Sequence, residues 1–264
     1  MGESGAFEER RVLDIALDAG HILLQNGAEI ARVEETMERI CRHYGVSGDE
    51  FFVLSNGIFA TSGHDSGKSY ARVQHIPVKG ARLDKVIAVN QLSRDIEAGI
   101  CENLETVEER LDDIKRLPSF PAGMQILASG VGSGFFCVLA GGGPLDCVSA
   151  CIAGMLLFVF ILYVSAPHLG RIVGNILGGF LVVLISLSCY RIGLGADLSH
   201  MISGAIMPLI PGTALTNGVR DIANGDYISG IVRMLDALFV FLSIAIGVGA
   251  MFTIYHAMTG GIMP

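Results

Sequence analysis

Polar side chains follow a double proline break inside one of the apolar stretches of the chain. Pro208 and Pro211 are three residues apart, and Gly212 follows the second proline. Each proline removes a backbone donor and clashes with the carbonyl four residues earlier. In hydrocarbon the freed carbonyls have no water to bind, so broken backbone is stable only beside protein or a wet cavity. Transporters commonly build substrate sites at such breaks.

The residues after the break have the chemistry to bind a small carboxylate. A helix that starts at Pro211-Gly212 presents free amide donors and a partial positive charge. Thr213, Thr216 and Asn217 follow at helical spacing, so all three can face one cavity. The sequence therefore predicts substrate-binding residues at Pro211, Gly212, Thr213, Thr216, Asn217 and Arg220. The alternative is a proline-kinked span whose Thr and Asn side chains only contact neighbouring helices.

Charged residues beyond this site are candidates for coupling or gating, namely Asp221, Asp226, Arg233 and Asp236. Arg233 and Asp236 are three residues apart and could pair on one helix face. An apolar run follows Asp236, which places its carboxylate at or just inside the hydrocarbon boundary. An ionisable residue there is costly and is by default a functional candidate. An interfacial charge paired with Arg233 is the alternative for Asp236.

Composition divides the chain into two predicted domains. Residues 1–116 contain 14 of the 18 Lys and Arg residues and 21 of the 26 Asp and Glu residues. Residues 117–264 contain no Lys and no Glu. Pro118 and Pro121 stop a helix where the composition changes, so we expect the boundary there. The acidic first domain lacks the basic face that nucleic-acid binding requires.

Periodicity predicts an α+β cytoplasmic domain followed by an α-helical membrane domain of five transmembrane helices, the fourth interrupted at Pro208/Pro211. The expected spans are residues 124–142, 147–166, 172–190, 201–219 and 235–255, each close to the length that a bilayer core requires. In the first domain we expect helices at residues 7–25, 29–44, 83–98 and 103–115. Strands are expected at residues 51–54, 58–61 and 70–76, with a hairpin turn at Asn56-Gly57 and a second turn at residues 64–68.

The charges between the spans predict the orientation in a plasma (inner) membrane. Only Arg191 lies on one side, whereas the other side carries Lys115, Arg116, Arg171, Arg220 and Arg233. The positive-inside rule then places the N-terminus in the cytoplasm and the C-terminus outside. No phosphate-binding loop, nucleophile–base motif or metal-ligand spacing is recognisable, so we expect no enzyme, no cofactor and no metal.

Two groups of residues resemble the threonine/serine exporter family. One group lies near the break, in Pro211-Gly212, in Asn217-Gly218-Val219-Arg220-Asp221, in Gly225-Asp226, in Ser229-Gly230 and at Arg233. The other lies in the first domain, in Asn26-Gly27-Ala28-Glu29, in Arg32-Val33-Glu34 and in the hairpin from Asn56 to Ser62. The resemblance covers nearly the whole chain. It implies a cytoplasmic domain followed by five membrane helices.

The resemblance also implies a partner. Fused members of the family carry roughly twice as many spans, and split members pair a long chain with a short five-span subunit. The split group includes succinate exporters, whose long subunit is similar to this chain in length and layout. Asp236 stands where the family often has an acidic residue. This chain shows one break of this kind, so a short partner subunit or a second copy would supply the other half.

The sequence thus predicts a subunit of a secondary exporter of small carboxylate-bearing metabolites, driven by the proton-motive force. Threonine or serine and a succinate-like dicarboxylate both remain open as substrates. The alternative is a non-transporting membrane protein, either a regulatory subunit or a hydrolase that acts through the cytoplasmic domain.

Overall fold

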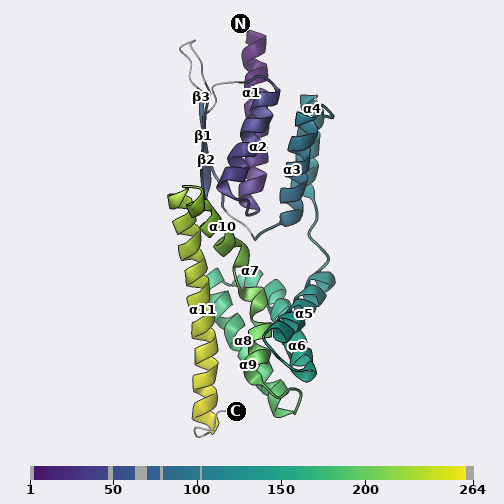
Figure 1. The fold of residues 1–264 in the computed structure, drawn as a ribbon, viewed down its shortest axis with the longest axis vertical. Helices are drawn as coiled ribbons and strands as arrows, with labels where there is room; N and C mark the ends of the chain where they lie inside the picture. The colour runs from purple at the N-terminus through teal and green to yellow at the C-terminus, as the bar shows by residue number, and fades with distance from the viewer. Residues whose placement is uncertain (1–2, 47–49, 63–69, 78–79, 102, 260–264) are drawn as a thin grey trace. The chain divides into compact units, whose positions relative to one another are not determined.

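The computed structural model describes residues 3–46, 50–62, 70–77, 80–101 and 103–259. The protein is mostly helical with one small three-stranded sheet, as expected. It forms two compact units (Figure 1). Unit 1 contains Met1–Pro118 and Gly212–Leu235, and unit 2 contains Ser119–Pro211 and Asp236–Pro264. Unit 1 is therefore built from two segments that lie far apart in the sequence.

Unit 1 contains the helices and the sheet of the N-terminal segment together with α10. Its elements are α1 (Glu3–Gln25), α2 (Ile30–His43), β1 (Glu50–Leu54), β2 (Gly57–Ser62), β3 (Tyr70–His75), α3 (Leu83–Glu97), α4 (Leu104–Arg116) and α10 (Gly212–Ala223). The first turns of α11 (Tyr227–Thr259) complete it. The α1–α2 hairpin forms a middle layer, with the sheet on one side and α3 and α4 on the other (Figure 1).

The sheet is an antiparallel meander in the order β1-β2-β3. Leu54 pairs with Gly57, so the first hairpin turn is Ser55-Asn56, one residue earlier than expected. Strand residues alternate between two faces. Val53, Ile58 and Ala60 point into the core, where they join α1 and α2. The second predicted turn, residues 64–68, lies outside the described residues.

Unit 2 consists of apolar helices. These are α5 (Ala122–Leu139), α6 (Pro144–Phe160), the π-helical turn η1 (Ile161–Ser165), α7 (Ala166–His168), α8 (Arg171–Arg191), α9 (Leu198–Ala205), the 3₁₀ turn η2 (Met207–Leu209) and α11 from Asp236 onward. By length and composition, four helices within the described residues can cross a membrane. A fifth span results if α9, η2 and α10 are counted as one bent span.

A break is present at the two prolines, where the helices on either side are bent by 67°. Helix α9 ends at Ala205, η2 contains Pro208, and α10 starts at Gly212 after Ile210 and Pro211. The last helix begins earlier than expected, at Tyr227 rather than near residue 235.

Glycines let the helices of unit 2 approach closely. A Cβ atom added at Gly179 would lie 2.7 Å from the carbonyl oxygen of Ile244. One added at Gly247 would overlap the carbonyl of Ile176, so α8 and α11 cross here with their backbones in contact. One added at Gly130 would lie 2.9 Å from the carbonyl oxygen of Cys151 on α6. Such small-residue contacts are typical of membrane helix packing.

Candidate functional site

The turn between α1 and α2 is the centre of the first candidate site. Helix α1 ends at Gln25, and Gly27 takes a φ of +84°, a left-handed conformation that glycine adopts without strain. The amide of Ala28 donates back to the carbonyl of Leu23 at 3.0 Å. This is a common way to end a helix. It leaves the carbonyls of Gly27 and Ala28 and the first amides of α2 to find partners elsewhere.

Asp221 caps the start of α2 from a helix 191 positions away in the sequence. Glu29 stands at the N-cap of α2, but its side chain makes no capping bond. Instead the amide of Ile30 donates to Oδ1 of Asp221 at 3.1 Å. Asp221 is fully buried. A carboxylate at a helix N-terminus is favoured both by the free amides and by the helix dipole.

Arg233 balances that buried carboxylate and binds the same turn. Its Nη1 lies 3.2 Å from Oδ2 of Asp221, and its Nη2 donates to the carbonyl of Ala28 at 2.9 Å. Arg233 is also buried. A buried ion pair is stable only when its remaining hydrogen-bonding groups are satisfied. The carbonyl of Ala28 and the amide of Ile30 provide such partners, while Oδ2 of Asp221 is balanced by the charge of Arg233 and accepts no hydrogen bond within the described residues.

Asn217 and Arg220 complete the contacts to the turn. The side-chain amide of Asn217 donates to the carbonyl of Gly27 at 2.6 Å. Arg220 donates to Oε1 of Glu29 at 2.6 Å, and Arg32 approaches the same oxygen at 3.3 Å. We call Asn217, Arg220, Asp221 and Arg233 the turn clamp. The two motifs on which the family resemblance rests thus touch each other directly.

Helices α10 and α11 can supply the clamp because they cross closely. A Cβ atom added at Gly230 would lie 2.8 Å from the carbonyl oxygen of Gly218 and 2.9 Å from the amide of Ile222. Between the helices Gly225 takes a φ of +98°, and the amide of Asp226 donates to the carbonyl of Asp221 at 2.9 Å. The tight crossing fixes Asp221 and Arg233 relative to each other.

Asp226 influences the pKa of a neighbouring acid, Glu34, which belongs to one of the family-like motifs but was assigned no role from the sequence. Glu34 on α2 is partly buried and accepts the amide of Val53 at 3.3 Å. Burial raises the pKa of Glu34 above its ordinary value of 4.5, and the nearby charge of Asp226 raises it further. The hydrogen bond from Val53 opposes that shift.

The remaining predicted substrate residues lie apart from the clamp. Pro211 is partly exposed, and Gly212 and Thr213 are exposed at the start of α10. Thr216 is exposed too, and its hydroxyl donates to the carbonyl of Gly212 at 2.9 Å within the helix. Of the predicted substrate residues, the structure brings Asn217 and Arg220 together at the α1–α2 turn.

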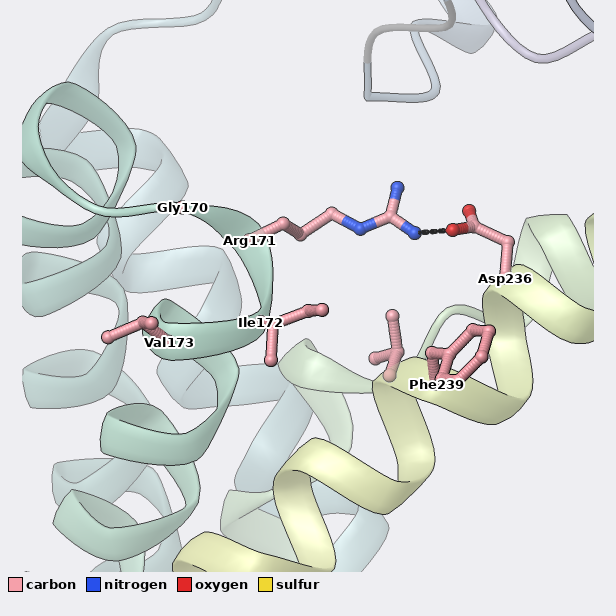
Figure 2. A pocket seen from close by; sticks show the side chains of 7 residues that line it. Gly170, Arg171, Ile172, Val173, Asp236 and Phe239 are labelled. Carbon is pink, nitrogen blue, oxygen red and sulfur yellow. Dashed lines mark hydrogen bonds and ion pairs between the residues drawn. The ribbon is translucent and has the colours of Figure 1, made fainter.

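Asp236 belongs to a second site, in unit 2. It forms an ion pair with Arg171 at the start of α8, above an apolar pocket (Figure 2). The pairing of Arg233 with Asp236 considered from sequence does not form, since Arg233 binds Asp221 and Asp236 binds Arg171. Spacing along one helix could not reveal this, because both partners lie far away in the sequence. Sequence reasoning used Arg171 only for orientation and missed its role as partner.

Comparison with known proteins agrees with the resemblance seen in the sequence. A family model described as "Putative threonine/serine exporter" matches residues 14–255. No solved structure matches the chain. The chain is 26% identical to the "Probable succinate transporter subunit YjjP" of Klebsiella aerogenes, over 91% of this chain and 93% of that one.

Two further relatives show different coverage. The protein of the same name from Escherichia coli is 25% identical, over 94% of this chain and 96% of its own length. The "Threonine/serine exporter" of Corynebacterium glutamicum is 25% identical, over 90% of this chain but only 50% of its own length. The chain is a multi-pass inner-membrane transport protein rather than an enzyme, and it belongs to the threonine/serine exporter family.

Proposed function

We propose that this chain is the long subunit of a two-subunit secondary exporter of small carboxylate-bearing metabolites, either threonine and serine or a succinate-like dicarboxylate. The coverage of its relatives carries this proposal. The chain matches proteins named as transporter subunits almost from end to end, but only half of the longer threonine/serine exporter. A short five-span subunit is the natural supplier of the other half, because secondary transporters commonly combine two related repeats.

We further propose that residues 1–116 form a cytoplasmic α+β domain and that residues 117–264 form five spans, the fourth broken at Pro208/Pro211. The C-terminus is then outside. The turn clamp supports this orientation. Arg220 and Arg233 bind the α1–α2 turn, so these two cations belong on the same side of the membrane as the N-terminal domain.

The substrate site in this proposal lies at the break before α10. Thr213 and Thr216 are exposed there, and Arg220 keeps about half of its side chain exposed although it binds Glu29. Hydroxyls, the first amides of α10 and one guanidinium suit a carboxylate. Pro211, Gly212 and Asn217 shape the start of this helix and its attachment to the turn.

Gating and coupling are assigned to Asp221, Asp226, Arg233 and Asp236, with the proton-motive force as the energy source. The buried Asp221–Arg233 pair joins α10 and α11 to the N-terminal domain, so a change at the turn can be transmitted to the break. Asp236 is half-exposed and ionisable near the hydrocarbon boundary, as a coupling carboxylate must be.

Efflux from preloaded cells tests the proposal. Labelled threonine, serine and succinate are followed in cells that express the chain alone, the chain with its short five-span subunit, and a Thr213→Val, Thr216→Val double variant with that subunit. Thr253→Val is the matched control, because Thr253 is also exposed and donates to the carbonyl four residues earlier, at 2.8 Å. We expect flux that requires the partner, is lost in the double variant and persists in the control.

Two results would contradict parts of the proposal. Absence of partner-dependent flux for all three substrates would reject the exporter assignment and leave a regulatory role. Normal flux in the double variant would move the substrate site away from the break.

A further inference from the structure

The pocket beneath the Arg171–Asp236 pair lies between the first turns of α8 and the adjoining part of α11, entirely within unit 2 (Figure 2). Its volume is about 500 Å³. Ile172, Phe239 and Val240 contribute apolar lining, and Arg171 and Asp236 are its charged residues. In Figure 2 the guanidinium of Arg171 reaches from the start of α8 toward the carboxylate of Asp236 on α11.

The two helices are held together at one end of this pocket. Beyond it, Gly179 and Gly247 bring the backbones of α8 and α11 into contact, at Ile244 and Ile176. A crossing with so little space cannot open without losing its packing. Arg171 and Asp236 lie N-terminal to that crossing on their two helices, and the pocket there has an apolar lining and these two charged residues.

The charges at the mouth can exchange partners with a ligand. The side chains of Arg171 and Asp236 are 60% and 48% exposed. An ion pair with this much contact with solvent stabilises little, so a ligand that satisfies both charges can replace it at small cost. Such a ligand must carry one anionic and one cationic group a few ångströms apart.

We propose that this pocket binds a zwitterionic α-amino acid, with its carboxylate on Arg171 and its ammonium group on Asp236. A guanidinium binds a carboxylate in two parallel hydrogen bonds, and an aspartate accepts from an ammonium group. The small side chain of the ligand then lies against Ile172, Phe239 and Val240. A dicarboxylate fits poorly, because one of its carboxylates would meet the negative charge of Asp236.

This assignment rests on the proposed function and narrows it. It selects the amino acid over the dicarboxylate, and it gives the proposed coupling residue Asp236 a direct contact with the ligand. In the proposed orientation Arg171 is on the cytoplasmic side, where an exporter collects its substrate. The pocket is then a loading site, separate from the residues at the break before α10.

Equilibrium binding of labelled L-threonine tests the assignment in the full chain, reconstituted with its short subunit in nanodiscs without any ion gradient. L-Threonine methyl ester, which lacks the carboxylate, and N-acetyl-L-threonine, which lacks the ammonium group, serve as competitors together with succinate. We expect unlabelled threonine to compete at least about tenfold better than each of the three, since each loses a charged hydrogen bond or gains a repulsion. These comparisons use the unaltered protein, so they do not depend on the folding of a variant.

Variants then identify the residues. Arg171→Gln and Asp236→Asn should each weaken threonine binding about tenfold or more. Arg171→Gln should abolish the preference for threonine over the methyl ester, and Asp236→Asn the preference over the N-acetyl derivative. Arg191→Gln is the matched control, because Arg191 ends the same helix and binds the Tyr255 hydroxyl at 3.0 Å, away from the pocket.

The outcomes separate this assignment from the proposed function. Unchanged threonine binding in both variants, or succinate competing as well as threonine, would overturn the assignment while partner-dependent efflux could persist. If efflux of every substrate is absent in the unaltered protein, the exporter proposal itself fails.

Discussion

Asp221 contacts two groups at once through its two carboxylate oxygens. One carboxylate oxygen caps α2 at Ile30, and the other balances Arg233. Both charged groups are buried. Removal of one partner leaves the other charge in a place where water cannot solvate it, which is far more costly than the loss of an exposed pair.

We therefore expect Asp221→Ala to lower the free energy of unfolding by roughly 3–5 kcal/mol. Arg11→Ala is the control, because Arg11 and Glu108 form a partly exposed two-bond pair in the same unit, whose loss should cost much less than an unpaired buried charge. Thermal or denaturant unfolding in detergent measures both. A similar small loss in the two variants would show that the buried pair does not contribute as described.

The raised pKa of Glu34 makes the stability of unit 1 depend on pH. Its raised pKa means that the folded state binds this proton more tightly than the unfolded state. The contribution of Glu34 to stability is therefore greatest below its ordinary value of 4.5 and is lost as pH rises through the raised pKa.

Glu34→Gln should remove this loss, because glutamine can still accept the amide of Val53 without carrying a charge. The stability gained by the variant relative to the unaltered protein should grow from pH 4 to pH 8, a range of about four units around the ordinary pKa. Unfolding curves across that range measure it, with Glu35→Gln on the exposed face as control. An equal difference at both ends of the range would contradict the assignment.

The sequence indicated the residues of the clamp but not their partners. Asn217, Arg220, Asp221 and Arg233 stood out because polar groups are rare in an apolar segment. Three of their partners are backbone groups of Gly27, Ala28 and Ile30, which have no distinctive side chain that a sequence pattern could reveal, and Arg220 binds the side chain of Glu29. Periodicity reports only neighbours within a few turns, so contacts across 190 positions cannot be read from it.

At the scale of elements, close approach between α10 and α11 sets the geometry of the clamp. Gly218 and Gly230 face each other with no space for a side chain, and a Cβ at Gly230 would meet the Ile222 side chain and two backbone atoms, the carbonyl oxygen of Gly218 and the amide of Ile222. Backbone cannot rotate away as a flexible side chain can, so the helices themselves would have to separate.

Gly230→Ala should therefore destabilise the protein by about 1–3 kcal/mol, the usual cost of overpacking. Gly249→Ala lies in the same helix, at a position where an added Cβ meets nothing within 4 Å. That control should be neutral or stabilising by up to about 1 kcal/mol, because alanine favours helix. A lower melting temperature for Gly230→Ala with an unchanged or higher one for Gly249→Ala would support the close packing of α10 against α11. Equal shifts in the two variants would contradict it.

Helices and strands were largely predictable, because hydrophobic periodicity and proline positions are local signals. The break before α10 was predicted for this reason. The start of α11 at Tyr227 was not, since Arg233 resembles a charge in a loop until its buried partner Asp221 is known. The first hairpin turn was displaced by one residue because Asn56-Gly57 is a strong turn signal, whereas the strand register makes Gly57 the first residue of β2.

At the scale of the whole molecule, unit 1 is completed by residues that come after three candidate membrane spans and the short helix α9 in the sequence. Substitutions in α10 or in the first turns of α11 should therefore alter the local stability of the α1–α2 turn. Hydrogen exchange can detect this, because it measures the local opening that exposes each amide.

We expect Asn217→Ala and Arg233→Ala to increase exchange of the Ile30 amide by up to about tenfold, as the loss of a hydrogen bond to the turn implies. Thr216→Val is the control, because Thr216 bonds only to its own helix in the described contacts. Peptides that cover the α1–α2 turn give the readout by mass spectrometry. Exchange that is unchanged in all three variants would show that the clamp does not restrain the turn.

Because unit 1 consists of two segments far apart in the sequence, its parts are synthesised on the ribosome at different times. The amide of Ile30 is synthesised 191 positions before the carboxylate that caps it. At ordinary elongation rates the wait lasts about 10–40 s, while the intervening apolar helices leave the ribosome. During that interval the first segment is an incomplete domain with uncapped backbone, a natural client for chaperones. Unit 1 can therefore finish folding only after the chain has been translated past the third candidate span and the proline break. A chain arrested earlier lacks the residues that complete its first domain.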